Sequence, residues 1–121
     1  MKILVAEDNN SNWLLVRAIL KGYELKHVIN GQEAVDEMKN NNYDLILMDM
    51  KMPIMGGLEA THTIRTFNKK IPIIALTAYA FETDREKAMA EGCNAFVVKP
   101  LKKSILEETI RIESEKYQQN M

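Results

Sequence analysis

The chain has 121 residues, of which 46% are hydrophobic and 27% charged, which is the composition of one globular domain with a single core. Its formal net charge of -1 argues against a nucleic-acid surface, which needs an excess of basic residues. The hydrophobic runs are far too short to span a membrane, and Cys93 is the only cysteine, so an internal disulfide is excluded and a cytoplasmic setting is expected.

Short apolar runs alternate with amphipathic segments along the whole chain. The runs predict strands at Lys2–Ala6, Leu25–Ile29, Leu45–Met48, Ile71–Leu76 and Ala95–Val98. The segments between and after them predict helices at Ser11–Lys21, Gly31–Asn40, Leu58–Phe67, Thr83–Glu91 and Lys102–Tyr117. This alternation predicts a doubly wound α/β fold of the flavodoxin-like kind, with a five-stranded parallel sheet in the order 2-1-3-4-5 and helices on both faces.

Local signals predict where some of these elements end. Thr83 and Glu86 have the spacing of a capping box, and Gly92 is suited to end the same helix in the left-handed conformation. The apolar face of the last helix is predicted to consist of Leu101, Ile105, Leu106 and Ile110. After Glu113 the sequence turns polar, so we expect a frayed tail or linker at the end of a single domain that spans residues 1–121.

Acidic residues stand at the ends of two predicted strands. Glu7 and Asp8 follow the first strand, and Asp49 follows the third. In the predicted strand order these two ends lie beside the topological switch point, where open α/β sheets bind their ligands. Three adjacent carboxylates repel one another unless a cation lies among them. The sequence therefore predicts a bound divalent metal and a carboxylate nucleophile, Asp49.

Two other strand ends carry polar groups to the same edge of the sheet. The fourth strand runs into Thr77–Ala78, and the fifth runs into Lys99–Pro100. A hydroxyl and an ammonium group are therefore expected next to the acids.

Together these residues resemble the receiver domain of two-component response regulators. The matching pieces are Glu7–Asn9, Met48–Pro53 with Gly56–Gly57, Thr77–Ala78 and Lys99–Pro100. Each short piece alone is weak, but all of them occur in order at strand ends, and the match covers essentially the whole chain. The stretch Gly57–Thr61 with Ile64–Arg65 is similar to receivers of hybrid sensor histidine kinases.

The resemblance implies a phosphoacceptor switch in a phosphorelay, with Mg²⁺ as its cofactor. Asp49 would attack a phosphohistidine and become an aspartyl phosphate. The metal would be held by Asp8, Asp49 and the backbone carbonyl of Lys51. Glu7 would act mainly through a metal-bound water, because Mg²⁺ keeps several of its waters.

The resemblance also implies how the phosphoryl group is bound and read out. Lys99, the Thr77 hydroxyl and the Ala78 N–H would contact its oxygens. Thr77 would then move toward the phosphoryl group, and Phe96, at a position where many relatives have tyrosine, would turn inward. This switch would remodel the surface formed by the fourth helix, the fifth strand and the fifth helix.

Two positions are predicted to tune the lifetime of the phosphoryl group. Lys51 and Tyr79 should flank the path of an attacking water. Lys51 also argues against a phosphohydrolase, since such enzymes have a second aspartate at that position. A nucleotide-binding module is the weaker alternative, because neither a G-x-G-x-x-G sequence nor a P-loop is present.

The expected partner is a histidine kinase or a histidine phosphotransfer domain, without direct contact to nucleic acid or membrane. A homodimer formed on phosphorylation stays open, as does a place in the cytosolic part of a membrane-anchored hybrid kinase. His27, His62 and Cys93 are expected to be structural or surface residues, and Trp13 to pack on or near the first helix. No enzymatic activity is expected beyond self-catalysed phosphotransfer and slow autodephosphorylation.

Overall fold

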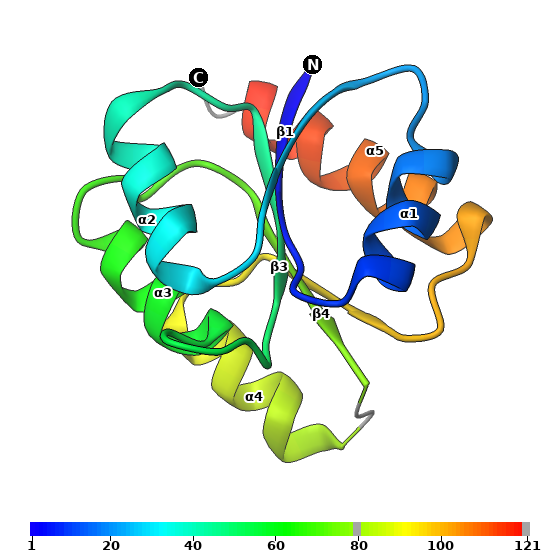
Figure 1. Ribbon diagram of the computed structural model, residues 1–121. Helices are drawn as coiled ribbons and strands as arrows, with labels where there is room; N and C mark the ends of the chain where they lie inside the picture. The colour runs from blue at the N-terminus through cyan, green and yellow to red at the C-terminus, as the bar shows by residue number, and fades with distance from the viewer. Residues whose placement is uncertain (79–80, 120–121) are drawn as a thin grey trace.

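Five parallel strands form the central sheet of the computed structural model, which describes residues 1–78 and 81–119 (Figure 1). Their order is β2-β1-β3-β4-β5, which confirms the prediction. The strands are β1 (Lys2–Ala6), β2 (Glu24–Val28), β3 (Leu45–Asp49), β4 (Ile73–Thr77) and β5 (Ala95–Val98). Because all of them run in the same direction, their carboxyl ends share one edge of the sheet.

A helix follows each strand, and the helices cover both faces of the sheet (Figure 1). They are α1 (Asn10–Ile19), α2 (Gly31–Asn40), α3 (Gly57–Arg65), α4 (Glu82–Glu91) and α5 (Lys103–Gln119). Helices α1 and α5 lie on one face, and α2, α3 and α4 lie on the other. The start of β1 and the end of α5 lie at the edge opposite to the strands' carboxyl ends. Among the described helices, none has the length and apolarity needed to cross a bilayer.

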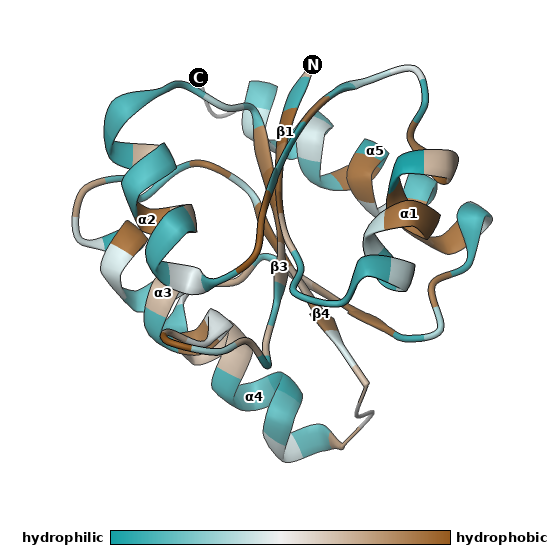
Figure 2. Ribbon diagram, in the orientation of Figure 1, coloured by the Kyte–Doolittle hydropathy of each residue, from teal (hydrophilic) through white to brown (hydrophobic). Residues whose placement is uncertain are grey.

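Side-chain alternation along the strands builds two separate cores. In β1, Ile3 and Val5 face α1 and α5, while Leu4 and Ala6 face the helices on the other side. Every residue of β3 and β4 is buried, as expected for strands covered on both faces. Hydropathy colouring agrees with this layering, with mostly brown strands and helices in which teal residues alternate with paler and brown ones (Figure 2).

Asparagine side chains cap the starts of two helices, and a glycine ends a third. Asn9 and Asn30 cap α1 and α2, and each accepts a hydrogen bond from a backbone N–H of the first helical turn. Gly92 ends α4 with φ 113, the left-handed conformation that its position predicted.

The capping box predicted at Thr83 is wrong. Helix α4 begins at Glu82, so Thr83 already lies in its first turn, and Phe81 occupies the N-cap position without a side-chain hydrogen bond. Acidic Glu82 and Asp84 stand in that turn instead, where the positive end of the helix dipole favours them. The other predicted bounds agree with the structure within two residues.

Two expectations about the last helix are also wrong. Ile105 is 51% exposed, because successive residues of a helix are rotated by about 100° and Leu106 takes the inward position. The helix does not fray after Glu113 but continues to Gln119. Glu113 and Ser114 are buried, and this packing extends the helix past the point where the sequence turns polar.

Candidate functional site

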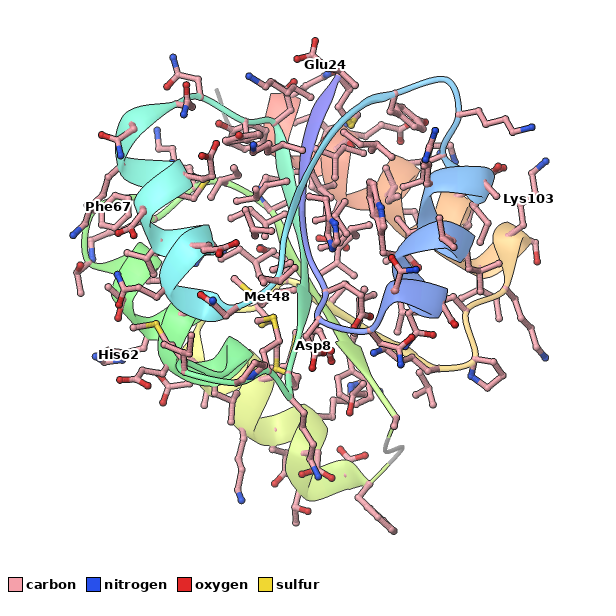
Figure 3. The ribbon with its side chains drawn as sticks, viewed as in Figure 1. Asp8, Glu24, Met48, His62, Phe67 and Lys103 are labelled. Carbon is pink, nitrogen blue, oxygen red and sulfur yellow. The ribbon has the colours of Figure 1, made fainter. Side chains whose placement is uncertain are left out.

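Three carboxylates meet at the carboxyl edge of the sheet. Strand β1 leads into Glu7 and Asp8, and β3 ends on Asp49. Because Ala6 pairs with Met48 in the parallel register, Glu7 comes to lie beside Asp49. One oxygen from each of the three acids lies within 4.8 Å of the others. Figure 3 shows Asp8 near Met48 at this edge, with Glu24 at the opposite one.

The three acids differ in their exposure to solvent. Glu7 is 0% exposed and Asp49 is 4% exposed, while Asp8 is open to solvent. Burial, and after it the adjacent Glu7 carboxylate, raise the pKa of Asp49 to about 6 against the opposing effect of Lys99. The ionised form of Asp49 is therefore disfavoured in this site, and the positive charge of a bound cation would stabilise it.

Lys99 supplies the positive charge at this edge. Its Nζ lies 2.8 Å from Glu7 Oε1 and 3.3 Å from Asp49 Oδ1. The backbone N–H of Lys99 donates to the carbonyl of Thr77 at 2.7 Å, which fixes the end of β5 against the end of β4. Three carboxylates against one ammonium leave two negative charges in the site.

One buried oxygen of Glu7 tests whether this site fits a metal ion. Glu7 Oε2 accepts a hydrogen bond from the N–H of Asn9 at 3.2 Å. Glu7 Oε1 is buried and, although Lys99 pairs with it ionically, it has no hydrogen-bond partner in the described part of the chain. A divalent cation with its bound water would satisfy both this oxygen and the surplus charge, so the residues present fit Mg²⁺, which prefers oxygen ligands.

The remaining predicted site residues lie around this cluster. Thr77 is buried at the end of β4, and Ala78 follows it at the same edge with its side chain exposed. Lys51 donates its backbone N–H to Asp49 Oδ1 at 3.3 Å, and its side chain is exposed. Phe96 is half-buried and packs against the core under α2, α3 and α4. Tyr79 lies outside the described residues.

Gly57 holds the end of β3 against the start of α3. The N–H of Gly57 donates to the carbonyl of Met50 at 3.1 Å. A Cβ on Gly57 would collide with the backbone carbonyl oxygen of Asp49. Gly57 is therefore required by close approach, whereas the sequence suggested only a turn.

Two residues that support the site were not foreseen. Asn9 caps α1 and donates to Glu7 Oε2 from its backbone, and an Asn just before a helix is a signal that could have revealed the cap. The imidazole of His27 contacts the backbone carbonyl of Glu7 at 2.7 Å, a contact that no sequence pattern indicates. Away from the site, His62 pairs with Glu91 at 2.9 Å, and burial raises the pKa of the Cys93 thiol to about 11, which agrees with structural roles.

The sequence is similar to a known protein family and to several curated proteins. The family model of the response regulator receiver domain matches residues 3–111. Hybrid signal transduction histidine kinase I of Dictyostelium discoideum is 42% identical over 127 residues, covering 96% of this chain but 7% of that protein. The polar-differentiation response regulator DivK of Brucella anthropi is 37% identical over 113 residues, covering 90% of this chain and 92% of DivK.

Solved structures agree with the sequence matches. The receiver domain of the sensor histidine kinase PA1611 from Pseudomonas aeruginosa has a TM-score of 0.88 and 36% identity, covering 94% of this chain and 97% of that one. That crystal structure holds a magnesium ion in its active-site cleft. The chain spans small parts of several curated relatives, such as 13% of the autoinducer 2 sensor kinase/phosphatase LuxQ of Vibrio vulnificus.

Proposed function

Because the chain belongs to the response regulator receiver domain family of two-component signalling, we propose that Asp49 is its phosphoacceptor. The observation that carries this assignment is the convergence of Asp49 with Glu7, Asp8 and Lys99 at one edge of the sheet. Asp49 is the acid that ends the central strand, and it contacts both Lys99 and the backbone of Lys51. Glu7 is buried in the same cluster, but it lies beyond the end of β1, whereas Asp49 is the last residue of β3.

In the proposed reaction a carboxylate oxygen of Asp49 attacks the phosphorus of a phosphohistidine. The P–O bond forms, the P–N bond breaks, and the electron pair leaves with the imidazole nitrogen, which takes up a proton. The product is an aspartyl phosphate. Burial at the sheet edge limits the water that could compete with the incoming group.

Mg²⁺ would be held by Asp8, Asp49 and the backbone carbonyl of Lys51, with Glu7 acting through a bound water. When bound, it neutralises charge on the transferring phosphoryl group. The P. aeruginosa receiver with magnesium in its cleft supports this choice of metal. Glu7 Oε1, which is buried and paired with Lys99 only ionically among the described residues, supports a water-mediated role for Glu7.

Lys99 and the end of β4 would bind the phosphoryl oxygens. Lys99 Nζ already lies 3.3 Å from Asp49 Oδ1, so a phosphoryl group there would compete with Glu7 for the ammonium. The Thr77 hydroxyl and the Ala78 N–H would contribute hydrogen bonds, and Phe96 would follow Thr77 inward. Signalling would then pass through α4, β5 and α5.

The proposed donor is a histidine kinase or a histidine phosphotransfer domain in the cytoplasm. The similarity to hybrid kinases supports a domain that works as part of a phosphorelay and not as an enzyme with its own substrate. Self-association on phosphorylation is a separate possibility that native mass spectrometry would test. Lys51 and Tyr79 are the positions proposed to set the lifetime of the aspartyl phosphate.

Acetyl phosphate with Mg²⁺ tests the assignment of Asp49. The wild-type chain should gain one phosphoryl group in intact-mass spectrometry, and Asp49→Asn should gain none. Asp44→Asn is the matched control: this exposed acid accepts a hydrogen bond from the N–H of Lys2 at 2.7 Å, far from the site, so its labelling should stay at the wild-type level. Labelling of Asp49→Asn would require another acceptor, and continuous turnover of a phosphate ester would indicate an enzyme instead.

A further inference from the structure

The backbone carbonyl of Glu7 receives its hydrogen bond from a side chain. His27 Nε2 lies 2.7 Å from this oxygen. A carbonyl oxygen only accepts, so Nε2 must carry the proton and donate it. Glu7 is 0% exposed, and a buried carbonyl without a partner is unfavourable.

The geometry of the sheet explains why a side chain is used here. The backbone N–H of Glu7 donates a hydrogen bond to the carbonyl of Val28, the last residue of β2, at 3.0 Å. In a regular parallel ladder the next donor to Glu7 would come from Asn30. The chain has left the sheet at that point, because Asn30 caps α2. The imidazole of His27 therefore provides the hydrogen bond that the backbone no longer supplies.

Trp13 holds the imidazole in place. The two rings are stacked, with centroids 4.2 Å apart and an interplanar angle of 7°. Trp13 belongs to α1 and packs against the core on that side of the sheet, and Leu25 packs against the same core. The tryptophan thus limits rotation of His27 away from Glu7.

We propose that His27, supported by Trp13, is a positioning residue for the metal carboxylates. It fixes the peptide group between Glu7 and Asp8, and so the direction in which Asp8 leaves β1. The proposal rests on the metal-dependent function proposed above. It assigns to a residue of β2, which touches neither metal nor phosphoryl group, a part in forming the site.

Magnesium affinity measured by titration calorimetry tests the proposal. His27→Phe keeps a ring that stacks on Trp13 but removes the donor, and it should weaken Mg²⁺ binding about tenfold, the lower end of what loss of a supporting partner costs a metal site. Trp13→Ala keeps the donor but removes the ring behind it, and it should weaken binding by a smaller factor. Urea unfolding without metal, followed by circular dichroism, measures the stability of each variant separately.

Leu25→Ala is the matched control. Leu25 lies two residues before His27, on the same face of β2, where it pairs with Ile3 and packs against the same core as Trp13. It should lower stability and leave Mg²⁺ affinity unchanged. Wild-type affinity in His27→Phe, or an equal loss in Leu25→Ala, would overturn the proposal. Failure of the wild-type chain to bind Mg²⁺ would instead refute the proposed function.

Discussion

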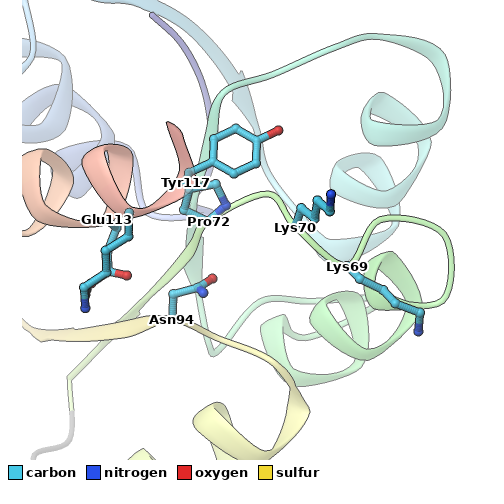
Figure 4. A pocket seen from close by; sticks show the side chains of 7 residues that line it. Lys69, Lys70, Pro72, Asn94, Glu113 and Tyr117 are labelled. Carbon is cyan, nitrogen blue, oxygen red and sulfur yellow. Dashed lines mark ion pairs between the residues drawn. The ribbon is translucent and has the colours of Figure 1, made fainter. Parts of the chain in front are cut away.

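A glutamate stands beside a lysine at both edges of the sheet, and the two pairs differ in burial and in surroundings. At the carboxyl edge, Glu7 and Lys99 are 2.8 Å apart, with side chains 0% and 14% exposed. At the opposite edge, Glu113 and Lys116 are 3.5 Å apart, with side chains 10% and 64% exposed. The second pair borders a hollow of about 240 Å³ (Figure 4). Its lining consists of Lys69, Lys70, Pro72, Asn94, Glu113, Lys116 and Tyr117.

The balance of charge separates the two edges. Around Glu7 the acids outnumber the lysine, and one carboxylate oxygen has no hydrogen bond from any residue that the structure describes. Around Glu113 the lysines outnumber the acid, and their exposed ammonium groups are screened by water and salt. The buried excess of negative charge around Glu7 would be stabilised by a bound cation. The exposed excess of positive charge around Glu113 is already stabilised by water. The comparison indicates why similar residue pairs support chemistry at one edge and only packing at the other.

Removing the buried charge of Asp49 should give the largest change in stability. The pKa of Asp49 is raised from 3.8 to about 6 in the folded chain, so the folded state binds the proton more tightly than the unfolded state does. Its contribution to stability is present below about pH 4 and is lost as the pH rises through about 6. Asp49→Asn should therefore raise the free energy of unfolding at pH 7, without metal, by up to about 3 kcal/mol.

Urea unfolding in EDTA between pH 4 and pH 8 measures this effect. The difference between wild type and variant should grow from about pH 4 to about pH 6 and then stay constant. Mg²⁺ should stabilise the wild type and leave the variant nearly unaffected. Glu113→Gln, at the other edge, should show no such gain, and an Asp49→Asn variant less stable than wild type at pH 7 would contradict the charge argument.

The two lysines should differ in their effect on phosphorylation. Lys99→Ala should slow labelling by acetyl phosphate about a hundredfold, because a cationic donor to the developing phosphoryl charge is lost. Lys116→Ala removes a comparable ammonium group at the opposite edge and should leave the rate within about twofold. Initial rates by phosphate-affinity electrophoresis give both values. Equal rates in the two variants would show that the contact of Lys99 with Asp49 has no part in the reaction.

Magnesium affinity should depend on Asp8 more than on any acid at the opposite edge. Asp8→Ala should weaken Mg²⁺ binding by about tenfold or more, since Mg²⁺ is bound through very few carboxylates. Titration calorimetry, or the fluorescence of Trp13, gives the Kd. Glu113→Gln serves as the control and should bind as the wild type does. An unchanged Kd in Asp8→Ala would remove this residue from the ligand set.

Much of the fold and of the site could be predicted, because strands that are buried on both faces appear in the sequence as continuous apolar runs. Strand β3 is covered on both faces, so its apolar run stands out, and Asp49 interrupts that run at its end. The position of Asp49 at the carboxyl edge then follows from the parallel sheet. The sequence predicted Lys99 next to the acids, but not that its Nζ lies closer to Glu7, at 2.8 Å, than to Asp49, at 3.3 Å, because this depends on side-chain directions that only the packed structure fixes.

The errors have equally specific causes. Thr83 fitted a capping box, but local spacing cannot tell which of two neighbouring residues begins a helix. The polar end of α5 looked like a tail because its stability comes from tertiary burial of Glu113 and Ser114 and not from an apolar stripe. The stack of His27 on Trp13 joins residues from two different elements, and no periodicity marks it.

The start of β1 and the end of α5 both lie at the edge of the sheet opposite to the carboxyl ends of the strands (Figure 1). A polypeptide joined to the start of β1 or to the end of α5 would leave the domain on that side. Such a segment would not cross the edge where Glu7, Asp8, Asp49 and Lys99 meet. Further sequence could therefore be joined before β1 or after α5 without covering the carboxyl edge of the sheet.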